Sequence, residues 1–244
     1  MTTLVLASAS PRRRELLALT GLPFEARAAG IAEIPRDGEG TVEYVQRVAR
    51  EKAEAITNTA RTPPLAGHTG SGAGDKVLMT DEAMGNELLV IACDTEVVIG
   101  GEILGKPKDA ADAEAMLLRL RGRTHEVISA VAVLDSRSGQ LREDVCRSEV
   151  PMRNFSDDEI AVYVASGDPL DKAGAYAIQH DGFHPMEKFG HCYASVMGLP
   201  LCHLTRTLRA FGVEPPADVP TACQQFTAYQ CPVYEEILNR VEHE

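Results

Sequence analysis

Strand-like and helix-like segments alternate along most of this 244-residue sequence, which favours an α/β fold over an all-helical protein or a β-sandwich. The strongest strand signal is the continuous apolar run LLVIAC at 88–93, which is typical of a strand buried on both faces. Further strands are expected at 3–7, 24–28, 97–99, 125–134 and 141–150. Helices are expected at 11–19, 109–120, 156–166, 200–212 and 235–241, and from residue 41 onward. A chain of this length can bury a substantial core, as one large domain or as two close-packed lobes.

Several of these elements carry local signals. The 109–120 helix has an apolar face made of Ala113, Met116, Leu117 and Leu120. The residues Ser-Asp-Asp-Glu at 156–159 have the form of a capping box. In the helix that begins at Thr41, Glu43 and Arg47 are spaced for an ion pair on the exposed side. The stretch 174–179, which begins at a glycine, is strand-like. The apolar run at 88–93 ends in Asp94-Thr95, so these two residues are expected at the end of a strand.

Two segments do not fit the alternation. Residues 58–87 are rich in Gly, Pro and Thr and are predicted to be a flexible surface insertion. Their GSGAGDK differs from a phosphate-binding P-loop, because Asp75 separates the lysine from the glycine and Val77 follows it. The tail after residue 212 contains Pro215, Pro216 and Pro220. We therefore expect one domain at 1–212 and a C-terminal extension at 213–244.

The junction between the first strand and the first helix, Ser8-Ala9-Ser10-Pro11, is suited to binding an anion. Small hydroxyl residues cap helices, and proline is favoured in the first turn. The unpaired amides and the positive end of the helix dipole then form an anion site. Three arginines follow at 12–14, of which at most two can share one helix face. The alternative interpretation is a solvated basic helix start.

The overall charge makes this basic cluster more informative. The chain has 24 Lys and Arg against 36 Asp and Glu, a net charge of −12, which is unlike a nucleic-acid or anionic-membrane binder. A local anion site in such a protein indicates a small phosphorylated ligand. Six cysteines without a CxxC pair indicate reduced thiols rather than disulfides or zinc. No apolar run approaches about 18 residues and no signal peptide is recognised, so no membrane partner and a cytoplasmic location are expected.

Charged residues occur at places where a plain fold would not need them. Asp94 follows the buried strand, Glu33 lies in a loop bounded by Gly and Pro, and Lys106 lies in a tight turn. Asp171 and Lys172 precede the strand-like stretch. Each also has an ordinary alternative, such as a strand-end cap for Asp94 or a solvated surface position for the others.

Together these residues favour metal-assisted cleavage of a polyphosphate. Asp94, Glu33 and Asp171 offer oxygen ligands for Mg²⁺ or Mn²⁺, and the basic residues would neutralise phosphate charge. The amide of Gln179 is suited to reading the edge of a nucleobase. Neither a GxSxG elbow nor an HExxH motif is present, so serine and zinc hydrolase chemistry lacks support.

Five motifs occur in the order found in one known family. They are SxSPRR at 8–13, AREKA at 49–53, ACDT at 92–95, GKP at 105–107 and GDPLDKAGAYAIQ at 167–179. With these motifs, residues 3–210 resemble the Maf family of nucleoside triphosphate pyrophosphatases. The resemblance implies a two-lobed α/β fold, similar to inosine-triphosphate pyrophosphatases, with a mixed sheet flanked by helices and a central cleft. It also implies hydrolysis of a nucleoside triphosphate to the monophosphate and pyrophosphate with a divalent cation (Mg²⁺, Mn²⁺ or Co²⁺), and a homodimer.

The resemblance also implies roles for individual residues. The catalytic set is Asp94, Glu33, Lys52 and Lys106, with Asp94 as proton acceptor and with Glu33 and Asp94 as metal ligands. The substrate-binding set is Ser8, Ser10, Arg12, Arg13, Thr95, Asp171, Lys172 and Gln179. Arg12, Thr95 and Gln179 match the subgroup that acts on dTTP and UTP rather than 7-methyl-GTP, with a house-cleaning role against modified pyrimidine nucleotides. Ala177 and His180 replace glycines common in the family, and this would narrow or stiffen the cleft floor.

Two other functions use the same charges. A nucleotide-binding regulator would bind without hydrolysis, and the presence of both Glu33 and Asp94 argues against it. A nucleotidyl- or phosphotransferase would depend on an acceptor other than water.

Overall fold

A six-stranded mixed sheet forms the centre of the protein, whose computed structural model describes residues 2–61 and 87–240. The strands are β1 (Thr3–Leu6), β2 (Glu25–Ala26), β3 (Leu88–Ile99), β4 (Glu102–Ile103), β5 (Thr124–Asp135) and β6 (Leu141–Pro151). Their order is β2-β1-β3-β5-β6, and β4 pairs with β3. β1 is parallel to both of its neighbours, and the other pairs are antiparallel. The expected α/β class with a mixed sheet is confirmed.

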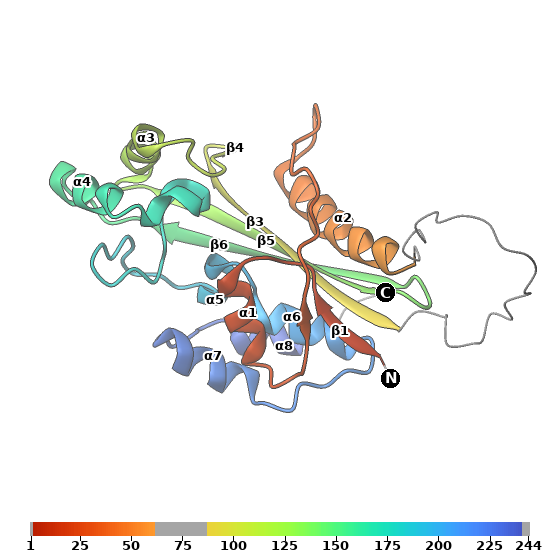
Figure 1. Cartoon of the computed structure of the whole chain (residues 1–244). Helices are drawn as coiled ribbons and strands as arrows, with labels where there is room; N and C mark the ends of the chain where they lie inside the picture. The colour runs from red at the N-terminus through yellow and green to blue at the C-terminus, as the bar shows by residue number, and fades with distance from the viewer. Residues whose placement is uncertain (1, 62–86, 241–244) are drawn as a thin grey trace, which may run out of the picture.

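Helices cover both faces of this sheet (Figure 1). They are α1 (Pro11–Ala18), α2 (Thr41–Arg61), α3 (Ala110–Leu120), α4 (Asp157–Ala165), α5 (Tyr193–Met197), α6 (Leu201–Arg209), α7 (Val219–Thr227) and α8 (Tyr234–Asn239). α2 packs on one face, α1, α5 and α6 lie on the other, and α3 and α4 lie side by side near the end of the sheet (Figure 1). Two 3-10 turns, η2 (Asp168–Asp171) and η3 (Ala173–Ala175), follow α4.

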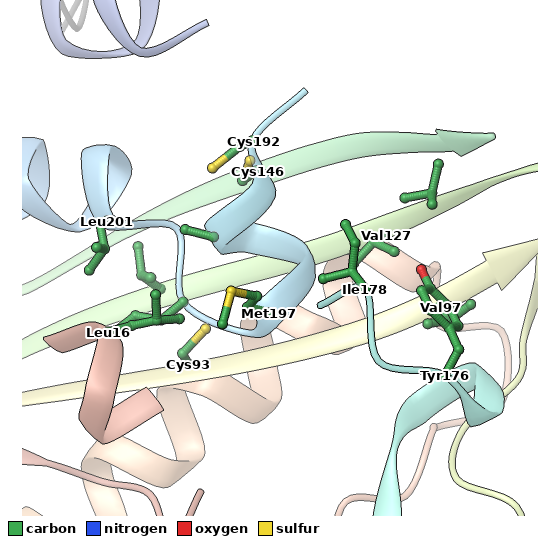
Figure 2. Packing of buried hydrophobic residues seen from close by; sticks show 14 of the residues in the cluster. Leu16, Cys93, Val97, Val127, Cys146, Tyr176, Ile178, Cys192, Met197 and Leu201 are labelled. Carbon is green, nitrogen blue, oxygen red and sulfur yellow. The ribbon is translucent and has the colours of Figure 1, made fainter. Parts of the chain in front are cut away.

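Alternate residues of β3 face the two helical layers, because side chains in a strand alternate between its faces. Odd-numbered residues such as Leu89, Ile91 and Cys93 belong to the larger core, together with residues of α1, α5 and α6. Figure 2 shows Leu16, Cys93, Met197 and Leu201 in this core. Even-numbered residues of β3 pack under α2 instead. Leu88, Val90 and Ala92 share a hydrophobic cluster with Ala53 and Ile56 of α2. Val98 belongs to a second cluster, which contains Val45 and Val48 of α2. Positions 94 and 96 therefore belong to the face that α2 covers.

The β3 strand is longer than predicted. We expected an end at Asp94-Thr95, but β3 runs on to Ile99 because β5 pairs with it from Leu89 to Val98. β1, in contrast, stops at Leu6, opposite Ile91. Between that point and the short β4, one edge of β3 has no strand beside it within the described sheet. Asp94 thus lies in mid-strand, just beyond the carboxyl end of β1, and the prediction that it ends a strand is wrong.

Most of the other local predictions are confirmed. The predicted apolar face of α3 is buried, and Asp109 caps the start of this helix. Ser156 and Glu159 form both bonds of the capping box at α4. The hairpin of β5 and β6 matches its predicted ranges to within one residue.

Four further predictions are wrong in part or in full. Residues 174–179 form the end of a 3-10 turn and irregular chain rather than a strand. Arg47 pairs with Glu39 and Glu51 instead of Glu43, because the loop before α2 folds back over the helix, while Glu43 accepts a bond from the Gly40 amide. The strand expected at 24–28 is only the two-residue β2. The insertion predicted at 58–87 begins inside α2, and its residues 62–86 lie outside the described residues.

Residues 213–240 pack against the sheet-covering helices. α7 contacts α5 and α6, and α8 contacts α6. Val219 is buried, and Pro220 lies in the first turn of α7, where its missing amide costs nothing. The Ala217 amide donates to the Thr20 carbonyl at 3.3 Å, so the segment that leads into α7 is attached to the end of α1.

Candidate active site

A cleft of about 1030 Å³ opens where β1 ends and β3 continues. Its lining comes from the β1–α1 junction, the loop after β2, α2 and β3 on one side, and from 103–106 and 168–179 on the other. All twelve predicted site residues line it: Ser8, Ser10, Arg12, Arg13, Glu33, Lys52, Asp94, Thr95, Lys106, Asp171, Lys172 and Gln179. Residues from six separate segments of the sequence therefore share one cavity large enough for a nucleotide. Their individual roles stay predictions.

The basic end of the cleft is built at the start of α1. Ser10 caps the helix, accepting a hydrogen bond from the Arg13 amide at 3.4 Å, and Ser8 Oγ accepts one from the Ser10 amide at 3.1 Å. Arg12 and Arg13 line the cleft, whereas Arg14 is exposed and does not. The expectation that at most two of the three arginines face the site is confirmed.

Arg13 and Arg12 differ in how they are held. Arg13 Nε donates to the Gly198 carbonyl at 2.8 Å, and its Nη2 donates to Thr95 Oγ1 at 3.4 Å. Thr95 Oγ1 is in turn 2.8 Å from Ser129 Oγ on β5. The Arg12 side chain has no hydrogen bond or ion pair with any residue that the structure describes. Arg13 is therefore a fixed part of the wall, and Arg12 is free to contact a ligand.

The acidic end of the cleft lies under α2. Lys52 Nζ, on the buried face of α2, donates to Asp94 Oδ1 at 2.7 Å and pairs with Glu33 Oε1 at 2.8 Å. Asp94 is only 2 % exposed, and its Oδ2 has no hydrogen-bond partner among the described residues. Burial raises the pKa of Glu33, but the charges of Lys52, Arg13 and Lys106 outweigh it and hold that pKa below its usual value. Glu33 is therefore an anion at neutral pH.

Glu96 also lines the cleft, although it was not among the predicted site residues. It is 8 % exposed, and its Oε2 has no hydrogen-bond partner among the described residues. Burial, and then the negative charges of Asp94 and Glu33, raise the pKa of Glu96 to about 8. One sequence signal could have identified Glu96: it lies two residues after Asp94. In a strand that continues through both residues, this spacing places both carboxylates on the same face of the sheet.

The site fits a hard divalent cation that takes some of its oxygen ligands from the protein and the others from a bound substrate. Within residues 2–61 and 87–240 there is no preformed group of three or more His, Cys, Asp or Glu that could hold a metal. Mg²⁺ is commonly bound through only one or two carboxylates plus phosphate oxygens. The unpaired, buried carboxylate oxygens of Asp94 and Glu96 offer that donor chemistry. Lys106 lies on the exposed rim, and its charge acts on both Glu33 and Glu96.

The opposite wall has its own charge network. Lys172 is buried, and its Nζ pairs with Asp168 at 3.0 Å and with Asp171 at 2.7 Å. Asp171 interacts with Lys172 and Arg12 rather than with Lys52, so it does not join the group formed by Glu33 and Asp94. Tyr163 Oη donates to Asp168 Oδ2 at 2.7 Å and accepts from the Ala177 amide at 2.9 Å, which holds this wall together. Gln179 is exposed at the edge of the wall.

The two replaced glycines do not strain the cleft floor. Ala177 and His180 have no positive φ, so a side chain is accommodated at both positions. The close approach is at Gly174, with φ +67°, where an added Cβ would lie 2.8 Å from Val97 Cγ1. Its amide donates to the Gly105 carbonyl at 2.8 Å, which ties this wall to the loop that carries Lys106.

Comparisons with known proteins show the family of this chain. The family model described as Maf-like protein matches residues 3–211. A protein of Anaeromyxobacter dehalogenans is 44 % identical over 219 residues, covering 89 % of this chain and 98 % of its own length. Proteins of Methylococcus capsulatus and Escherichia coli are 43 % and 42 % identical, each over 86 % of this chain and over 91 % and 94 % of their own lengths. All three relatives are named dTTP/UTP pyrophosphatase. No helix in the described ranges is long and apolar enough to span a bilayer.

Proposed function

This chain belongs to the Maf family, and we propose that it hydrolyses dTTP and UTP to the nucleoside monophosphate and pyrophosphate. One observation carries the proposal. The capped, arginine-bearing start of α1 and the Lys52–Asp94–Glu33 group line the same nucleotide-sized cleft. A triphosphate chain needs cations along its length, and its hydrolysis needs a group that accepts a proton from water.

The basic residues bind and orient the triphosphate. The α1 amides with Arg12 and Arg13 contact phosphate oxygens at one end of the cleft, and Lys106 approaches from the exposed rim. These positive charges stabilise the negative charge that grows on the leaving pyrophosphate. Ser8 and Ser10 fix the backbone of the helix start by accepting hydrogen bonds from the Ser10 and Arg13 amides.

Asp94 receives the proton of the attacking water. Water attacks the α-phosphorus, the bond to the bridging oxygen of the β-phosphate breaks, and pyrophosphate leaves. Lys52 holds Asp94 through Oδ1, which leaves Oδ2 facing the cleft without a protein partner among the described residues. A divalent cation (Mg²⁺, Mn²⁺ or Co²⁺), bound by Glu33 and Asp94, would polarise the phosphate oxygens.

The far wall selects the base. Gln179 offers an amide that pairs with the donor and acceptor edge of a pyrimidine, and Thr95 and Arg12 line the path between base and phosphates. Modified pyrimidine nucleotides present a similar edge, which fits the house-cleaning role of the family. The proposal further includes a cytoplasmic homodimer, with 1–212 as the catalytic domain and 213–244 as a C-terminal extension, of which α7 and α8 pack on α5 and α6.

Product analysis tests the reaction. Purified protein with Mg²⁺ should release pyrophosphate from dTTP and UTP faster than from purine triphosphates, and Asp94→Asn should abolish the release. Asp158→Asn, an exposed aspartate on α4 away from the cleft, is the matched control and should keep full activity. Orthophosphate as the first product would contradict the proposal, as would nucleotide binding without turnover or a requirement for another acceptor. A mass near 26.3 kDa in solution would exclude the homodimer.

A further inference from the structure

Asp94 and Glu96 form a pair of buried carboxylates on one strand. They are two residues apart on β3 and lie on the face that α2 covers. They are 2 % and 8 % exposed, both line the cleft, and each has one oxygen without a hydrogen-bond partner among the described residues. Buried polar atoms in folded proteins nearly always have a partner, so two adjacent exceptions indicate a ligand from outside the chain.

One cation contacts the carboxylates around this pair, among the residues that the structure describes. Three carboxylates meet here, those of Glu33, Asp94 and Glu96, and each influences another electrostatically. Lys52 is the cation in contact with the group, and both of its ion pairs are with Glu33 and Asp94. Lys52 is thus shared by two of the three carboxylates, and within the described residues no cation is in contact with Glu96. A divalent cation would supply the positive charge that a buried carboxylate needs.

We propose that Glu96 is, together with Asp94, a ligand of the divalent cation used in the reaction. This rests on the proposed function. Residues i and i+2 of a strand are about 6.6 Å apart along the chain, so two side chains on the same face can converge on one ion. Two carboxylates plus oxygens of a bound triphosphate suffice for Mg²⁺ or Mn²⁺.

A hydrogen bond from a sugar hydroxyl to Glu96 is the main alternative. Such a bond would satisfy one oxygen of Glu96 but would leave the two neighbouring carboxylates repelling one another with no cation between them. A cation satisfies both oxygens and removes the repulsion. The observations therefore favour the cation.

Direct Mn²⁺ binding separates these roles. The free Mn²⁺ signal in electron paramagnetic resonance is titrated with full-length wild type, Glu96→Gln and Glu102→Gln, with and without a dTTP analogue that cannot be cleaved between its α- and β-phosphates. Glu102 lies on β4, pairs with Arg119 and is outside the cleft lining, so its variant is the matched control. We expect Mn²⁺ binding about ten-fold weaker or more in Glu96→Gln and unchanged in Glu102→Gln. Glu96→Asp, which keeps the charge on a shorter arm, should fall between wild type and Glu96→Gln.

Two outcomes of the Mn²⁺ titration would overturn the inference. Equal Mn²⁺ affinity in wild type and Glu96→Gln overturns the inference, and if KM for dTTP rises at the same time, Glu96 contacts the nucleotide instead. A wild type that binds no Mn²⁺ overturns the inference and the proposed cofactor together. Pyrophosphate release by wild type is measured separately and decides the proposed function by itself. Melting temperatures without cation show whether each variant is folded, because an isosteric amide removes a buried charge and should not lower them.

Discussion

Lys52 Nζ lies 2.7 Å from Asp94 Oδ1 in the interface between α2 and β3, where most neighbouring contacts are apolar. Both side chains are almost fully buried, at 8 % and 3 % exposure. α2 is therefore both a covering helix and the source of the cation that holds the proposed proton acceptor in place. A buried pair of this kind is weak evidence for stability, but breaking one half of it is costly.

Replacing Lys52 should thus reduce both stability and activity. In Lys52→Met the Asp94 carboxylate is left buried without its cation, so the free energy of unfolding should fall by about 3 kcal/mol. Urea denaturation measures this, with Lys108→Met, an exposed lysine, as control. The double variant Lys52→Met/Asp94→Asn should recover part of the loss because the unpaired charge is gone. Unchanged stability in Lys52→Met would contradict the ion pair.

Alanine substitutions of the three arginines of α1 should differ in their effects on activity and on stability. Arg14→Ala should leave kcat/KM for dTTP unchanged because Arg14 is outside the cleft lining. Arg12→Ala should lower kcat/KM by roughly ten- to one hundred-fold, the equivalent of one or two charge-assisted hydrogen bonds, without changing the melting temperature. Arg13→Ala should lower both kcat/KM and the melting temperature, because Arg13 also donates hydrogen bonds to Gly198 and Thr95. Equal kinetics in all three variants would place the phosphates elsewhere.

Features set by neighbouring residues could be predicted from the sequence. The cap of α1, the capping box of α4 and the apolar face of α3 depend on side chains within one or two turns. The cleft lining could be predicted because the family motifs mark it, even though they come from five distant segments.

Features set by distant partners could not be predicted. The end of β3 is decided by its pairing with β5, so an acidic residue after an apolar run was misread as a strand end, and Glu96 was overlooked for the same reason. The turn at Gly174 depends on Val97 and on the Gly105 carbonyl, which no local pattern encodes. α7 was not predicted within the proline-containing extension, although Pro220 lies in its first turn, where proline is favoured.

Gly174 should be one of the positions least tolerant of a side chain. In Gly174→Ala the new Cβ would lie 2.8 Å from Val97 Cγ1 at a φ of +67°, so the free energy of unfolding should fall by about 1–3 kcal/mol. KM for dTTP should rise, because the wall that carries Lys172 and Gln179 must shift. Gly139→Ala is the matched control: its φ is +73° but its Cβ would meet nothing within 4 Å, so it reports backbone strain alone. Val97→Ala in the same chain should restore part of the stability; no restoration would contradict the steric cause.

His125 should make stability depend on pH below neutrality. It is buried, its Nε2 is 2.8 Å from Tyr176 Oη, and burial lowers the pKa of its imidazole to about 4 from 6.5. Between these values the unfolded chain binds a proton that the folded protein does not, so stability is fully present above pH 6.5 and is lost as pH falls through 4. Wild type should therefore lose on the order of 3 kcal/mol more than His125→Asn between pH 7 and pH 4 in urea denaturation. His184→Asn, at an exposed histidine, should instead follow the wild-type curve. If the curves of wild type and His125→Asn run parallel over this range, His125 keeps an ordinary pKa in the folded protein and its burial has no effect on the pH dependence.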